Sequence, residues 1–224
     1  RQHPVNVSFG PAAFPRDGDD VDQLFAACKR RLKEARRSLF RRLHLEDVDF
    51  WGAVDLLIGP DAAYKSGGVE VSGALQVAED EKGISRHHVF PRGFGELLRR
   101  EVITEAGRQG RSAGWLFFGG EWGRSDAQVS ELKPLQATQL KTYLLGDALA
   151  ARLASTGVTQ VRVDPDVFAK HELVLLLAEH ASYGMLARRR QDGSIYGFHT
   201  ADWTLVDGLI AKLQDAYHLQ KGAT

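Results

Sequence analysis

The chain has 224 residues, of which 43% are hydrophobic and 26% are charged, values that are ordinary for a globular protein. Its 29 basic and 29 acidic residues cancel, so no global field draws the protein to nucleic acid or to a membrane. The single cysteine, Cys28, excludes an intramolecular disulfide and a cysteine-cluster zinc site, and with no apolar run of about 18 residues it indicates a cytoplasmic protein. The first residues, RQHP, lack an initiating Met, and we expect a trimmed chain or an excised domain.

The first predicted element is a long basic amphipathic helix from about Asp20 to Leu43. Its apolar residues recur every three or four positions, and acidic residues crowd its start while basic residues crowd its end. The stretch KRRLKEARRSLFRR holds eight Lys or Arg residues and one acid. Four of these cations form a stripe opposite the apolar face: Arg30, Lys33, Arg37 and Arg41. Because neighbouring like charges repel, we expect an anionic group to offset them: the protein's own acids, an acidic protein partner or a nucleic-acid backbone.

The next part of the chain favours strands. Apolar or alternating runs predict strands at residues 50–61, 68–78, 83–90 and 114–120. The second and third of these flank the charged turn EDEKG, which indicates a hairpin, and residues 94–106 predict a short helix. The run GWLFFGG is apolar throughout and bounded by glycines, which is typical of a central strand that is covered on both faces.

The last part of the chain alternates helices with strands. We expect helices at residues 137–156, 166–181 and 202–219, a strand at 158–163, and a hairpin of residues 183–190 and 195–201 around an Asp-Gly turn. This order predicts an α/β fold, a layered mixed sheet flanked by helices. We expect an N-terminal part, residues 1–118, and a C-terminal unit, residues 132–224, or else one continuous domain.

The motif GISRHHVFPRG places two histidines side by side. Successive residues of a strand point to opposite faces, so His87 and His88 are not expected to act as a pair. A metal nuclease of this pattern needs a further ligand on the following helix, which offers only glutamates. A single functional histidine remains the alternative, and His88 is our candidate. His171 and His180 fall on opposite faces of the helix predicted there, which argues against a zinc site.

Two other stretches contain candidate site residues. In GPDAAYKSGGVEVSG, Asp61 and Glu70 have the outline of a carboxylate pair that holds Mg²⁺ in some nucleases, although Ser72 stands where a lysine is expected. In FGGEWGRS, glycines follow a central strand, where α/β proteins often bind ligands. The candidate ligand-binding residues of this loop are Gly119, Gly120, Trp122 and Arg124, the last as an anion-binding group.

Two functions follow as hypotheses. The first is a cytoplasmic regulatory domain that binds a ligand or a partner and has no cofactor and no catalytic residues of its own. The second is a nucleic-acid-binding protein or Mg²⁺-dependent nuclease that uses the basic helix with Asp61 and Glu70. A homodimer built through the basic helix is a third possibility. We favour the first because no complete catalytic constellation is present in the sequence.

Overall fold

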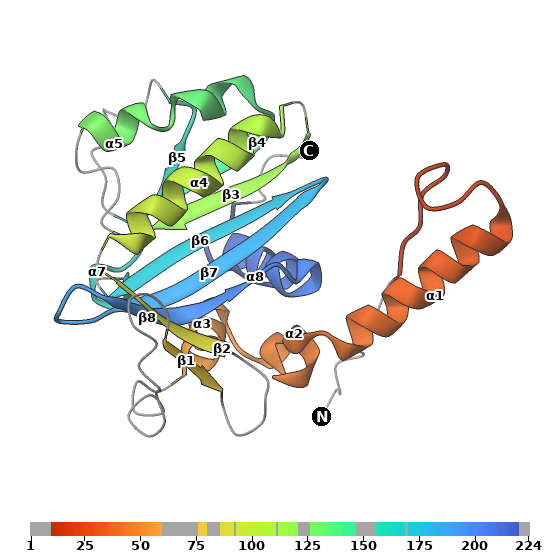
Figure 1. The fold of residues 1–224 in the computed structure, drawn as a ribbon, viewed down its shortest axis with the longest axis horizontal. Helices are drawn as coiled ribbons and strands as arrows, with labels where there is room; N and C mark the ends of the chain where they lie inside the picture. The colour runs from red at the N-terminus through yellow and green to blue at the C-terminus, as the bar shows by residue number, and fades with distance from the viewer. Residues whose placement is uncertain are drawn as a thin grey trace. The chain divides into compact units, whose positions relative to one another are not determined.

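A computed structural model describes residues 10–59, 76–79, 86–91, 93–110, 112–120, 126–146, 156–168 and 170–219 (Figure 1). The chain divides into two compact units, Arg1–Asp49 and Phe50–Thr224. In the described part of the chain, no helix is both long enough and apolar enough to cross a membrane.

The first unit is helical. It contains α1 (Val21–Arg37), α2 (Leu39–Arg42) and the short 3₁₀ helix η1 (Leu45–Asp47). The Asp20 carboxylate accepts a hydrogen bond from the backbone N–H of Gln23 at 2.7 Å, as a helix N-cap does. The expected single helix from 20 to 43 is wrong in its length, because Ser38 has an extended backbone (φ −59°, ψ 150°) and separates α1 from α2. Serine favours helix ends, since its hydroxyl competes for backbone groups.

The loop before α1 folds back onto that helix. Arg31 forms an ion pair with Asp17 at 2.6 Å and donates to the carbonyl oxygen of Pro11. The hydrogen bond from Arg31 holds the pKa of Asp17 below its usual range. Gly10 lies against α1 so closely that a Cβ there would come within 2.3 Å of the Cys28 carbonyl oxygen. Glycine is therefore required where the loop crosses the helix.

The second unit is built on one mixed sheet. Its strands, in chain order, are β1 (Gln76–Glu79), β2 (Arg86–Phe90), β3 (Gly114–Gly119), β4 (Leu140–Leu145), β5 (Thr159–Val161), β6 (His171–Ala178), β7 (Ala181–Arg189) and β8 (Ile195–Thr200). In the described residues the sheet has eight strands in the order β1-β2-β8-β7-β6-β3-β4-β5. The pairs β3–β4 and β4–β5 are parallel and the other pairs are antiparallel.

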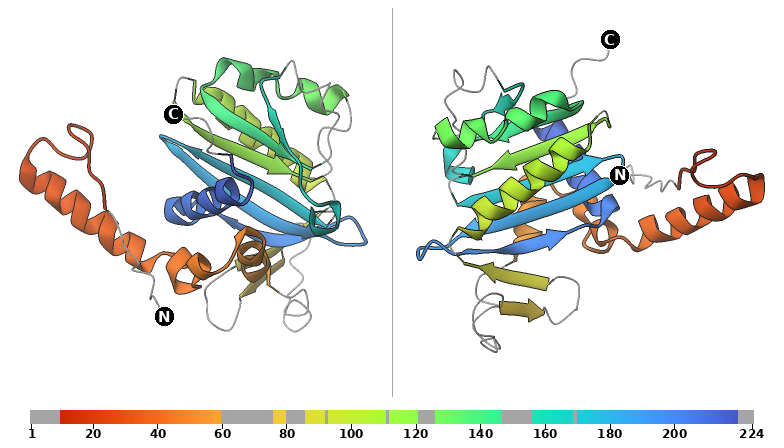
Figure 2. Two further views of the ribbon diagram at one scale, coloured as in Figure 1. Left: turned by 180° about the vertical axis from the view of Figure 1, so that it is seen from behind. Right: turned by 45° about the horizontal axis from the view of Figure 1, so that its top comes forward.

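Helices cover both faces of this sheet (Figure 2). One face carries α4 (Phe94–Arg108), α5 (Asp126–Ser130) and the 3₁₀ helix η3 (Lys133–Ala137). The other carries α3 (Phe50–Ile58) and α8 (Trp203–Ala216), which contacts β6 and β7. A short helix, α7 (Pro165–Phe168), precedes β6. The fold is therefore α/β, as the sequence predicts.

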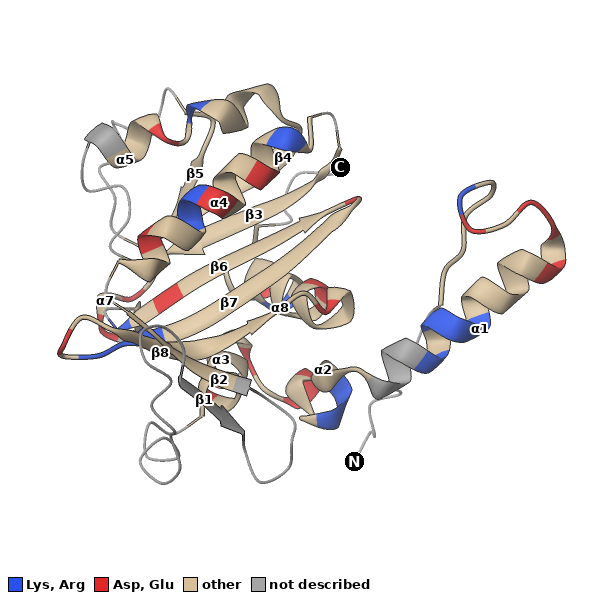
Figure 3. Ribbon diagram, viewed as in Figure 1, with Lys and Arg blue, Asp and Glu red and all other residues tan. Residues whose placement is uncertain are grey.

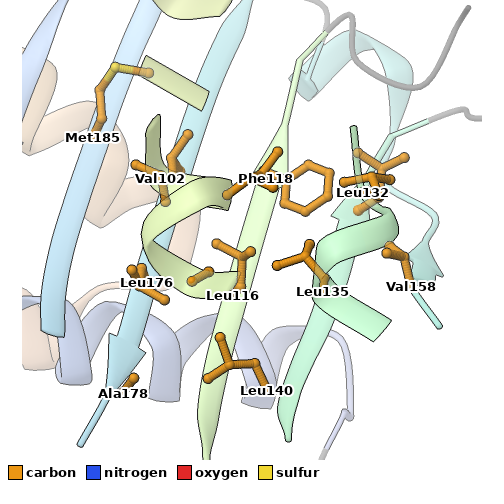
Figure 4. Close-up of a cluster of buried hydrophobic side chains, with 14 of the residues drawn as sticks. Val102, Leu116, Phe118, Leu132, Leu135, Leu140, Val158, Leu176, Ala178 and Met185 are labelled. Carbon is orange, nitrogen blue, oxygen red and sulfur yellow. The ribbon is translucent and has the colours of Figure 1, made fainter. Parts of the chain in front are cut away.

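The main core lies between the sheet and α4 (Figure 4). Leu116 and Phe118 of β3 point into it, together with Val102 of α4 and Leu135 of η3. Phe117, between them in β3, is also fully buried. Neighbouring strand residues point to opposite faces, so β3 is buried on both sides, which confirms the prediction of a covered central strand.

Three predicted elements are wrong in type. Residues 50–58 form the helix α3 rather than a strand, residues 140–145 form β4 rather than part of a helix, and residues 171–178 form β6 rather than a helix. All three are short and mainly apolar, and such a run has the same pattern in a buried helix as in a buried strand. Several patterned elements are confirmed: the hairpin of β7 and β8, α4, β5 and α8, whose N-cap Asp202 accepts from the Leu205 N–H. The antiparallel pairing of β1 with β2 agrees with the other predicted hairpin, whose turn and most of whose first strand lie outside the described residues.

The strands on either side of residues 119–131 belong to the same sheet. β3 ends at Gly119, the first residue of this stretch, and pairs with β4 and β6, which follow the stretch. The two compact units divide after Asp49.

Candidate functional site

The carboxyl ends of two parallel strands, β3 and β4, meet at one edge of the sheet. Gly120 and Gly146 follow these strands with φ values of 123° and 112°, which side-chain-bearing residues rarely adopt. A Cβ on Gly120 would come within 2.2 Å of the Glu172 carboxylate, and one on Gly146 within 2.8 Å of the Phe168 ring. Glycine therefore lets the backbone come directly against these two side chains.

A buried ionic group lies beside Gly120. We name it the arginine–glutamate cluster: Arg99 of α4, Glu172 of β6 and Arg189 of β7. Arg99 Nη1 donates to one oxygen of the Glu172 carboxylate at 2.5 Å, and Arg189 Nη2 donates to the other. The side chains of Arg99 and Glu172 are 5% and 3% exposed, and that of Arg189 is 28% exposed. The cluster therefore extends from the interior to the surface and ties three elements together.

The electrostatics of the cluster are unusual for a protein interior. Two guanidinium groups and one carboxylate sum to one positive charge in the cluster itself. Removing such groups from water costs several kcal/mol per ion, and close hydrogen-bonded pairing offsets that cost. Arg99 Nε is buried, and the described residues provide no acceptor for it. A buried charged group of this kind either fixes the fold or serves binding.

A second ionic group, the Asp55 cluster, lies on the other face at the same end of the sheet. It comprises Asp55 of α3, His171 of β6 and Arg188 of β7. Arg188 pairs with the Asp55 carboxylate, and His171 Nε2 lies 3.5 Å from the same carboxylate. The indole ring of Trp51 lies 5.3 Å from the imidazole ring of His171. Neighbouring residues of a strand point to opposite faces. His171 and Arg188 therefore belong to the Asp55 cluster, whereas Glu172 and Arg189 belong to the arginine–glutamate cluster.

The histidine pair of the sequence divides between the two faces as predicted. His87 is buried, stacks on Tyr196 at 5.5 Å, and has its Nε2 2.7 Å from the carbonyl oxygen of Leu57. A carbonyl only accepts, so that nitrogen carries the proton. Donation to a carbonyl at the end of α3 makes His87 a structural residue that holds this helix on the sheet.

His88 points to the face that carries α4. Its ring lies 4.7 Å from that of His199 on β8 and 5.5 Å from that of Phe90. Burial lowers the pKa of His199 and raises the pKa of Tyr183, 6.2 Å from His199, to about 12. Four strand spacings separate β2 from β3, about 19 Å. His88 therefore lies well away from Gly119 and Gly120, which were also predicted to bind a ligand.

The predicted cationic stripe is divided. Arg30 and Lys33 are exposed on α1, Arg37 is the last residue of α1, and Arg41 is half-buried on α2. The four residues do not share one helix, because Ser38 interrupts it. The remaining predicted site residues lie outside the described residues: Asp61, Glu70, Trp122 and Arg124.

The zinc interpretation of His171 and His180 fails for a simpler reason than the sequence indicates. His171 begins β6 and His180 lies in the turn after its last residue, Ala178, and the eight residues of the strand alone span about 25 Å. Among the residues that the structure describes, no three His, Cys, Asp or Glu side chains are grouped as metal ligands.

The residues that sequence reasoning missed are those of the two ionic clusters. A signal for Glu172 is present, since it is the one charged residue in the apolar run HELVLLLA. In a buried strand such a residue needs a partner. On the helix predicted for residues 166–181, Glu172 would be an ordinary exposed residue.

No family model, no curated protein and no solved structure matches this chain. Guanidinium groups beside glycine backbone at a strand end are suited to holding a polar or anionic group.

Proposed function

We propose that the protein is a regulatory domain that binds a small polar ligand at the carboxyl ends of β3 and β4. The observation that carries the proposal is the arginine–glutamate cluster, which lies against Gly120 at the end of β3. In open α/β sheets, ligands commonly bind outside the carboxyl ends of strands. The glycines there also bring backbone groups close to any bound molecule.

The cluster also supplies a route from binding to regulation. Arg99 comes from α4 and Arg189 from β7, and both hold the same carboxylate on β6. A ligand that interacts with the partly exposed Arg189 changes how strongly that arginine holds Glu172. The packing of α4 against β6 and β7 then depends on whether the ligand is bound. Such differential contact is what a ligand needs in order to shift a conformational equilibrium.

Thermal unfolding in the presence of small molecules tests this proposal. The panel contains inorganic phosphate, citrate, nucleoside monophosphates, amino acids and neutral sugars. A ligand at 100 times its Kd stabilises the folded state by about 2.7 kcal/mol. We expect Arg189→Gln to abolish that stabilisation and the matched control Arg108→Gln, an arginine 70% exposed at the far end of α4, to retain it. A ligand that stabilises both variants equally would place binding elsewhere and contradict the proposal.

Nucleic-acid binding is a second candidate, supported by the exposure of Arg30 and Lys33 on α1. Their contact with phosphates would weaken as salt rises. Fluorescence anisotropy with labelled DNA and RNA measures this directly. Binding that is absent at low salt, or that is unchanged in the Arg30→Glu/Lys33→Glu double variant, excludes this surface.

A further inference from the structure

Large apolar side chains at the start of α1 are exposed in the part of the first unit that the structure describes. Val21 and Phe25, one helical turn apart, are 75% and 61% exposed, and Phe14 in the preceding loop is 68% exposed. The loop that contains Gly10 already lies against Cys28 and Leu32, further along the same apolar stripe. The uncovered apolar part of α1 is therefore centred on Phe25. Exposed apolar groups gathered in this way are typical of an interaction surface.

Opposite charges lie on either side of Phe25 along the helix (Figure 3). The exposed acids precede it: Asp19, Asp20 and Asp22. The exposed cations follow it: Lys29, Arg30 and Lys33. Asp22 and Lys29 are seven residues apart, about 10 Å along the axis, which is too far for them to pair within one helix.

We propose that α1 pairs antiparallel with α1 of a second copy of this chain, around a two-fold axis between Phe25 and Ala26. In that arrangement residue i of one helix lies at the height of residue 51 − i of the other. Asp22 then lies at the height of the partner's Lys29, each about 5 Å along the helix from the axis. The two-fold axis repeats this contact, giving two reciprocal ion pairs. The two Phe25 rings meet at the centre.

The positions of Asp22 and Lys29 around the helix agree with this antiparallel register. Asp22 and Lys29 are two turns apart, so they differ by only about 20° around the helix and flank Phe25 on the same side. A two-fold axis perpendicular to the helices places this side of one helix next to the same side of the other, as in antiparallel coiled coils. Asp22 of one chain therefore lies on the same side of the contact as Lys29 of the other. The Lys29 ammonium group already lies over the Phe25 ring, 5.3 Å from its centre, which places the charge at the rim of the apolar contact.

A second copy fits this surface better than an unrelated acidic partner. An acidic partner would satisfy the cations after Phe25 but would repel the acids before it. The helix is complementary to itself only when it is reversed, and an isologous pair satisfies both charged ends at once. The proposal is independent of the ligand site in the second unit.

Sedimentation velocity of the full chain over a range of concentrations tests the pairing. We expect a concentration-dependent dimer that Phe25→Glu abolishes. Leu97→Glu, at a leucine 55% exposed on α4, is the matched control and should leave it intact. Lys29→Glu and Asp22→Lys each replace two attractive contacts with two repulsive ones, so we expect each to weaken the dimer about tenfold.

Charge exchange makes the test specific for two copies in this register. The double variant Asp22→Lys/Lys29→Glu should regain the dimer. An equimolar mixture of the Lys29→Glu chain with the Asp22→Lys chain should form a heterodimer, because both cross-chain pairs are then attractive. A chain that stays monomeric throughout, a dimer that Lys29→Glu leaves unchanged, or a failure of both rescues overturns the proposal. Docking of α1 on its own chain or on nucleic acid would appear as one of these outcomes.

Discussion

Replacing Glu172 with glutamine should be among the most damaging single changes in the protein. Glu172 is 3% exposed, and its carboxylate holds the guanidinium groups of Arg99 and Arg189. The amide has nearly the same shape but no charge, so Arg99, 5% exposed, becomes a buried cation without a counter-ion. Removing one partner of a buried ion pair costs about 3–5 kcal/mol. For a unit of this size that corresponds to a fall in Tm of roughly 6–20 °C.

Urea unfolding followed by circular dichroism measures this free energy. The control is Glu105→Gln, an exposed acid on α4 that pairs with Arg108, which we expect to change stability by no more than about 0.5 kcal/mol. The double variant Arg99→Met/Glu172→Leu removes both charges of the buried pair, and it should be more stable than Glu172→Gln alone. The reasoning is refuted if Glu172→Gln is no more destabilising than Glu105→Gln.

Three further outcomes are expected. Gly120→Ala should destabilise by about 1–3 kcal/mol in chemical denaturation, because alanine disfavours a φ of 123° and its Cβ would collide with the Glu172 carboxylate; an unchanged midpoint contradicts this. Asp202→Ala should cost about 1 kcal/mol in the same assay, since its carboxylate caps α8, whereas Asp202→Asn should cost much less. Tyr183, with a pKa of about 12, keeps its proton in the folded state, whereas a tyrosine in the unfolded chain loses it near pH 10. The free energy of unfolding should therefore fall from pH 10 to 12, and Tyr183→Phe should reduce that fall. An identical pH profile of the variant would count against the raised pKa.

The sequence predicts the elements whose pattern is distinctive. The hairpin of β7 and β8 has an Asp-Gly turn between alternating strands, and α8 has an acidic cap before a regular apolar stripe. Prediction from the sequence fails where the residues are uniformly apolar. The run LVLLLA in β6 has no periodicity that separates a buried strand from a buried helix, and only pairing with β3 and β7 decides it.

The candidate site also has one part that a local sequence pattern predicts and one part that only the fold brings together. The glycines after β3 could be identified from the chain alone, because a glycine pair ending a central strand is a local signal. The arginine–glutamate cluster could not, since Arg99 is 73 residues from Glu172 in the chain and their contact depends on the sheet order. Once 171–178 is known to be a buried strand, Glu172 requires a partner, and the fold supplies two.

The most direct test of ligand binding at the strand ends is a titration followed by amide NMR. The ¹⁵N-labelled protein is titrated with the compound from the thermal panel that stabilises it most. We predict the largest shifts at the backbone amides of Gly119, Gly120 and Gly146, and the loss of these shifts in Arg189→Gln. Shifts confined to the buried Gly184, five residues before Arg189 on β7, or shifts that persist unchanged in Arg189→Gln, would contradict the account.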